Sequence, residues 1–369
     1  MKKYLGFVLL FVYLFTAQGW AFPKDDKKKY TEGAGVGIVY SLPRTGVRVT
    51  VTASCEKVFR GPYYQFAEKY LNMKNAAVSD FENWKIKSIQ LNVFSEADPA
   101  HTYPATGANA ALVNVTSEGI LGGINQPVVE VAKPVFTSEN IALDPTPRII
   151  FPELLVNDFF KLESDSGKAK RPIPQTLEER AKVIAHELAR LGKRKAKMLT
   201  GDYEKMLPDG EAFHVMVDEV SKLEEEYVAM FMGKSFRYTR QYVFNVIPSA
   251  EGKEPVFRFS PDKGVLQKNE QNGNPVFVEY QPEEIQLLKQ NTTDQSQNVG
   301  GELFYRVPVN TLVKVTDGNG VLASSRFPIA QFGSILPIPV QLLDGNYSIQ
   351  LDPLTGTIKS IQKKKVEGK

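Results

Sequence analysis

The middle of the chain reads TLEERAKVIAHELARLGKRKAKMLTG over residues 176–201 and DGEAFHVMVDEVSKLEEEYVAMFMG over residues 209–233. Apolar residues recur in both stretches at spacings of three, four or seven, which predicts two helices that each carry one apolar stripe. Only a short loop separates the two stretches. We therefore predict a long antiparallel helical hairpin over residues 176–233, packed on the rest of the chain.

The ends of both helices carry recognisable signals. Thr176 and Glu179 form a capping-box pattern at the start of the first helix, and Gly201 is placed to end it. Asp209 is a candidate cap for the second helix, and Gly233 is a candidate end. These signals set the boundaries of the predicted hairpin.

Charges in the hairpin suit antiparallel packing. The first helix ends in a basic run at residues 193–197, and the second helix begins among Glu211, Asp218 and Glu219. Antiparallel packing would place these opposite charges beside one another. We expect contacts of this kind within the hairpin; a partner-binding coiled coil is the alternative.

The residues before the hairpin favour short strands. We expect strands at 36–42 and 47–58, separated by a turn at 43–46 that contains Pro43 and Gly46. Another strand is expected at 84–94, with a bulge where its apolar phase shifts between Ile86 and Ile89. The remaining expectations are a short helix at 61–71, a loop at 98–107, strands at 110–115, 120–124 and 128–135, and a proline-rich crossover.

The residues after the hairpin also favour strands. Alternation from Phe236 to Val246 predicts a strand with one aromatic face, and Gly-containing turns follow at 261–264, 272–273 and 317–320. Residues 290–300 are polar and are expected to form a mobile loop. Short strands at this spacing predict a sandwich or a partly open barrel.

These elements place the chain in the α+β class, with two β-rich domains, sandwich-like or partly open barrels, joined by the helical hairpin. The predicted segments are a signal peptide at 1–21, a flexible leader at 22–35, an N-terminal β-rich domain at 36–136, a crossover linker at 137–175, the hairpin at 176–233 and a C-terminal β domain at 234–369.

The first 21 residues have the pattern of an export signal. Lys2 and Lys3 precede an apolar run at residues 4–15, and small residues lead to a cleavage site after Ala21. The alternative, a retained membrane anchor, requires about 20 apolar residues, and this run is shorter. No cysteine follows the run, so lipoprotein processing is not expected.

Composition excludes some classes of protein. The 369 residues carry a net charge of +3, which becomes 3 − 2 = +1 without Lys2 and Lys3, so nothing indicates nucleic-acid binding. Cys55 is the only cysteine, which excludes an internal disulfide. It continues the apolar face of residues 47–53, and we expect a buried small side chain rather than a nucleophile.

Motifs for catalysis and cofactors are scarce. His186 and Glu187 resemble a zinc-protease pattern, but Arg190 stands where the second histidine is needed. His101 and His214 have no evident ligand companions, so we predict no metal, no cofactor and no catalytic residue. A pair of carboxylates that converges only in the fold would be invisible to this reasoning.

Aromatic residues supply the one candidate binding surface. They fill cores in most proteins, but several are concentrated before the hairpin, where exposed rings could form a platform for sugar or peptide. The candidate binding residues are Tyr63, Tyr64, Tyr70, Trp84 and Tyr103.

Several motifs together resemble one family. They are VYSLPRT at 39–45, GPYYQFAEKYL at 61–71, GILGGIN at 119–125 and PIAQFG at 328–333, together with LTG, LE and FMG within the hairpin. This set is similar to the domain-of-unknown-function family numbered 4831 of exported Bacteroidota proteins and covers nearly the whole chain after the leader. The resemblance implies that the protein is located in the periplasm or cell envelope, and it assigns no catalytic residues.

We therefore expect an exported envelope protein without catalytic activity that binds a glycan, a peptide or a partner protein. One alternative is an envelope hydrolase whose carboxylates meet only in the fold. Another is an assembly factor that docks through the hairpin. The sequence does not predict the oligomeric state.

Overall fold

The computed structural model describes residues 37–128, 146–148, 150–151, 160–163, 171–202, 210–249, 251–283 and 302–364. The predicted signal peptide, the leader, the loop at 290–300, most of the crossover and Asp209 lie outside these residues. Within them, no helix combines the length and the apolar character needed to cross a bilayer.

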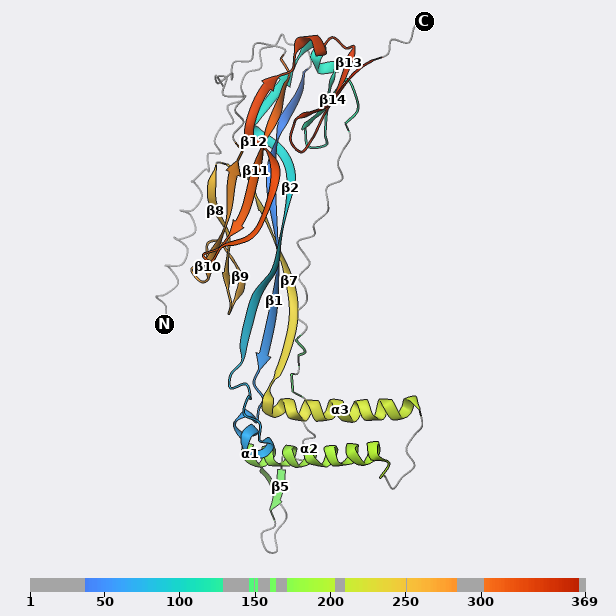
Figure 1. Cartoon of the computed structure of the whole chain (residues 1–369), viewed down its shortest axis with the longest axis vertical. Helices are drawn as coiled ribbons and strands as arrows, with labels where there is room; N and C mark the ends of the chain where they lie inside the picture. Colours follow the sequence, from blue (N-terminus) through green and yellow to red (C-terminus); the bar gives the residue numbers. More distant parts are fainter. Residues whose placement is uncertain are drawn as a thin grey trace, which may run out of the picture.

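Three long strands form the first sheet, in the order β2-β1-β7. They are β1 (Ile38–Phe59), β2 (Phe81–Ala105) and β7 (Lys234–Val246), and all pair antiparallel. In β7 partly buried residues alternate with exposed ones along the whole strand, which confirms the predicted aromatic face. This sheet forms the long axis of the molecule (Figure 1).

Five strands form the second sheet, in the order β12-β11-β10-β8-β9. Their bounds are β8 (Gly252–Ser260), β9 (Gly264–Gln267), β10 (Asn274–Pro282), β11 (Phe304–Thr316) and β12 (Val321–Pro337). The second sheet packs on the first through valines and aromatic rings from both, among them Val49, Phe257 and Val313, which are fully buried. The two sheets therefore make a sandwich, as the strand spacing predicts.

A third sheet, in the order β14-β13-β4-β3, covers a second core at the upper end of the long strands. Its strands are β3 (Val113–Val115), β4 (Leu121–Ile124), β13 (Tyr347–Leu351) and β14 (Ile358–Lys363). A separate two-stranded pair joins β5 (Phe160–Glu163) and β6 (Arg171–Pro174). The single-turn helices are η1 (Tyr64–Phe66), η2 (Gly107–Ala111) and η4 (Val340–Leu342).

Two long helices lie at the lower end of the long strands, beside the short α1 (Ala67–Leu71) (Figure 1). The helix α2 (Leu177–Thr200) begins with the predicted capping box and ends at Gly201, whose φ is 74°. The helix α3 (Glu211–Met232) ends at Gly233. Lys195 Nζ lies 2.7 Å from Glu224 Oε2, so the two helices are joined by an ion pair.

The predicted turn at 43–46 is wrong, because β1 runs through it as one strand of 22 residues. Its register against β2 shifts between Ser41 and Pro43, so the missing N–H of Pro43 falls at an irregularity of the ladder rather than at a reversal. The predicted loop at 98–107 is likewise replaced by the upper end of β2, which pairs with residues 38–41.

Other local predictions are confirmed or corrected in detail. The register of β2 against β1 shifts between Ile86 and Ser88, which confirms the bulge predicted between Ile86 and Ile89. Turns join β8 to β9 and β11 to β12 where expected. The expected strand at 110–115 is shorter, since η2 occupies its first half.

The sheets join the two β-rich segments that the sequence analysis separates. The strand β7 follows the helices in sequence but pairs with β1, and β13 pairs with β4. Periodicity marks where strands lie but carries no information about which strands pair, so the sequence does not reveal that the sheets take strands from both sides of the helices.

Candidate functional site

A groove opens between the edge strands of the two sandwich sheets. It is lined by Ile89, Gln90, Leu91 and Asn92 of β2 and by Ala323, Ser324 and Ser325 of β12, and its volume is about 330 Å³. Both strands end their sheets, so their outer backbone groups have no partner strand in the part of the chain that the structure describes. We call this feature the edge groove.

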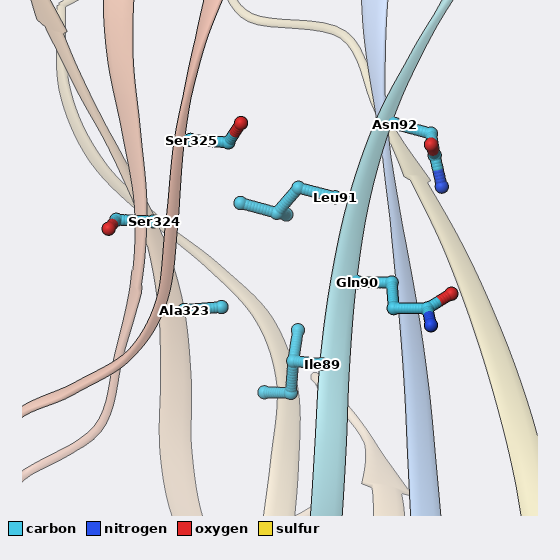
Figure 2. Close-up of a pocket in the computed structure, with 7 residues that line it drawn as sticks. All are labelled: Ile89, Gln90, Leu91, Asn92, Ala323, Ser324 and Ser325. Atoms are coloured by element: carbon cyan, nitrogen blue, oxygen red, sulfur yellow. The ribbon is translucent and has the colours of Figure 1, made fainter.

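Alternation along each strand decides which side chains enter the edge groove. Figure 2 shows Ile89 and Leu91 pointing from β2 toward β12, and Ala323 and Ser325 pointing back toward β2. Ser324 points away on the opposite face of β12. The groove is therefore walled by aliphatic side chains with a serine hydroxyl at its rim.

The edge groove has no charged lining. None of its seven lining residues is ionisable, so they offer no general acid, no general base and no carboxylate pair. The hydrolase alternative thus gains no site here and stays a prediction. What the groove offers is uncharged surface, with polar groups beside its aliphatic side chains, next to unpaired strand edges, a combination suited to binding an extended chain.

A second feature, the polar junction, consists of Asp98, His101 and Arg306. Arg306 of β11 is 2% exposed and donates from Nη2 to Asp98 Oδ2 on β2. His101 Nδ1 lies 2.8 Å from the same Asp98 oxygen and 3.0 Å from Arg306 Nη2. The junction lies beside the upper core and joins both sheets.

Electrostatics in the polar junction favour the charged pair. Burial acts to raise the pKa of Asp98, but hydrogen bonds from His101 and from the Ala100 N–H, with the charge of Arg306, hold it below its ordinary value. Burial lowers the pKa of Arg306, and Asp98 offsets part of this effect. Asp98 and Arg306 therefore form a buried ion pair, and both also contact His101 within the junction.

The candidate aromatic residues lie in three separate places. Tyr63 and Trp84 are buried, at 6% and 4% exposure, and pack in different cores. Tyr103 packs against Phe304 in the upper core, with ring centroids 4.8 Å apart. The structure therefore brings only Tyr63, Tyr64 and Tyr70 together, beside the helices.

Two of these aromatics keep some exposed surface. Arg60 lies over the Tyr64 ring, 5.4 Å from its centroid, and Lys69 lies 5.5 Å from the centroid of Tyr70. Their own cations thus occupy part of the ring faces that a sugar would need. Binding at Tyr64 and Tyr70 stays a prediction.

The histidines and the cysteine are placed as follows. Cys55 is 1% exposed beside Trp84, which confirms the expected burial. His186 is exposed on α2 and His214 on α3. Among the described residues no group of three His, Cys, Asp or Glu side chains is arranged to hold a metal ion.

Sequence reasoning did not find the edge groove or the polar junction. Asp98 and Arg306 are 208 residues apart, and β2 and β12 are edges only because of how the whole chain pairs. Of the residues in these two features, the sequence singles out only His101, which lies in the predicted loop at 98–107 and has no evident ligand companion.

Several residues of the motifs at 61–71, 119–125 and 328–333 make contacts between separate elements of the fold. A Cβ on Gly61 would lie 2.2 Å from the Met230 carbonyl oxygen, so glycine is needed where the turn before η1 meets α3. Asn125 donates to Gly345 O and Tyr347 O, at 2.7 and 2.9 Å. Gln331 bonds both backbone groups of Thr45, at 2.9 and 2.8 Å. These motifs are explained by the fold.

Comparison with known proteins gives one match. A family model described as Domain of unknown function (DUF4831) matches residues 36–359. This range takes in every strand and helix described above except the end of β14. No curated protein and no solved structure matches the chain.

Proposed function

This chain belongs to the family described as Domain of unknown function (DUF4831), and we propose that it is an exported, non-catalytic binding protein of the cell envelope. Its ligand is an extended segment of a partner polypeptide, held in the edge groove. The observation that carries the proposal is that two strand edges lie on either side of a groove whose lining is uncharged.

An added strand would gain two kinds of contact in the edge groove. Its backbone would pair with the outer edge of β2 or β12, and every second side chain would face Ile89, Leu91 and Ala323. At the lower end of β12, Val321 and Leu322 are 58% and 38% exposed and add apolar surface near this strand edge. The preferred segment is uncharged, with apolar residues at alternate positions.

Export supports the same assignment but rests on sequence alone. The expected mature chain begins at Phe22, after the predicted signal peptide. N-terminal sequencing of the protein recovered from a periplasmic fraction tests this expectation. A chain that still begins at Met1 and is found in the cytoplasm would contradict the proposed location in the cell envelope.

Binding is tested with a displayed peptide library and two matched variants. Ser325→Trp places a large ring in the edge groove, whereas Ser324→Trp places the same ring on the opposite face of the same strand (Figure 2). Peptides selected on the natural chain should bind Ser325→Trp at least about tenfold more weakly and Ser324→Trp unchanged. Equal affinities for all three proteins, or no selected peptide, would refute the edge groove as the site.

A further inference from the structure

The exposed side of α2 carries a line of basic residues. Lys182, His186, Arg190, Lys193 and Lys197 follow one another at spacings of four, four, three and four, and all five are exposed. Such spacings place side chains on one face of a helix. From Lys182 to Lys197 this line is about 22 Å long, at about 1.5 Å per residue. We call it the basic stripe.

The basic stripe lies on the side of α2 opposite to α3. The residues of α2 that face α3 are the buried Ala181, Ile184 and Met198, together with the paired Lys195. On a helical wheel these lie on the side opposite the stripe. In Figure 1 α3 lies between α2 and the long strands, and β5 projects below α2 on the side away from α3.

Charges of the basic stripe are mostly unmatched by the carboxylates that the structure describes. Arg190 pairs with Glu187, but no carboxylate of the described residues forms an ion pair with Lys182, Lys193 or Lys197. The expected contacts of this basic run with Glu211, Asp218 and Glu219 are not formed; the helices meet through Lys195 and Glu224 instead.

Helix-end electrostatics account for only part of the basic stripe. Lysines in the last turn of a helix are stabilised by its negative end, which covers Lys197 and, less well, Lys193. This effect fades within one turn and does not reach Lys182, in the second turn of α2. A straight cationic line along the whole helix fits an extended, flat anionic partner.

We propose that the basic stripe is a contact surface for a bilayer that contains anionic lipids. Lysine and arginine side chains held near such a surface are attracted by its negative potential, and the attraction adds with each residue. The straight helix α2 can present these charges to a bilayer without moving the strands of the three large sheets, with β5 projecting beyond it on the same side (Figure 1). This proposal is independent of the edge groove.

The test is flotation of the purified full chain with lipid vesicles. Vesicles of phosphatidylcholine mixed with phosphatidylglycerol should carry the protein upward at about 0.1 M salt, and pure phosphatidylcholine vesicles should not. Lys193→Glu with Lys197→Glu should weaken partitioning at least about 25-fold, since each basic residue contributes roughly fivefold.

The matched control is Lys263→Glu with Lys268→Glu, which makes the same change of net charge at exposed positions on either side of β9. It should retain most of the binding. An equal loss in both double variants, equal binding to neutral vesicles, or no binding by the natural chain would overturn the proposal. So would salt-sensitive self-association of the natural chain in place of vesicle binding, which would instead match the stripe to the acidic α3 of another copy.

Discussion

At the scale of single residues, Arg306 determines how β2 and β11 meet. It is a fully buried cation whose charge is balanced by Asp98, while its backbone N–H donates to Gly356 O at 3.0 Å. Enclosing two charges is costly, and the pair is tolerated because each stabilises the other. Removing only one partner leaves a buried charge without compensation.

Arg306→Met should therefore lower the free energy of unfolding by about 3 to 5 kcal/mol. Combining it with Asp98→Asn should recover part of this loss, because the uncompensated carboxylate is then gone. Urea denaturation near neutral pH of both single variants and the double variant measures the coupling. Strictly additive losses would show that the two side chains do not act as a pair.

Stability should also depend on pH through Asp98. Its pKa in the folded protein lies below the ordinary value of 3.8, so the pair contributes stability above that value and loses it as pH falls through the folded pKa. Urea denaturation from about pH 6 to about pH 3 should show this decline, and Asp98→Asn should have a shallower one. Identical slopes in the two proteins would contradict this assignment.

At the scale of elements, the sequence predicts features that depend on neighbouring residues, but it does not predict which strands pair. Thr176, Gly201 and the alternation of β7 act within a few residues, so the sequence predicts them correctly. The turn predicted at Pro43 is wrong because a proline in an extended strand beside a register shift has the same local pattern as a turn. The sequence does not predict the edge groove, because whether a strand lies at the edge of a sheet depends on its pairing with strands far away in sequence.

The start of α2 offers a test at this scale. Thr176 Oγ1 accepts from the Glu179 N–H, and the Glu179 carboxylate accepts from the Thr176 N–H. Thr176→Ala should destabilise α2 by about 1 kcal/mol, seen as faster amide exchange in its first turns. Thr200→Ala, which removes an exposed hydroxyl bonded to Ala196 O, is the control. Faster exchange in both variants alike would argue against the capping box.

At the scale of the whole molecule, the sheets make the chain one interlocked β unit. The strand β1 pairs along its length with β2 and β7, and the third sheet takes strands from both halves of the sequence. The predicted α+β class with β-rich segments fits the structure, whereas which strands share a sheet required the three-dimensional structure.

Fragments should reveal this interlocking. Residues 22–202 lack β7 and β13, so they should remain unfolded alone, as should residues 203–369 without β1 and β4. Co-expression of the two fragments should yield a complex with a cooperative thermal transition, followed by circular dichroism. A cooperative transition in either fragment alone would favour two independent domains.

The length of β1 has a mechanical consequence. Its 22 residues, Ile38–Phe59, span about 70 Å. Tyr40 lies in the upper core, and at the other end the carbonyl oxygen of Phe59 approaches Gly233 at the end of α3. A continuous paired strand of this length behaves as a stiff spacer. If the helices rest on a surface, whatever the edge groove holds is kept at a fixed stand-off height above it, set by the number of residues in the strand.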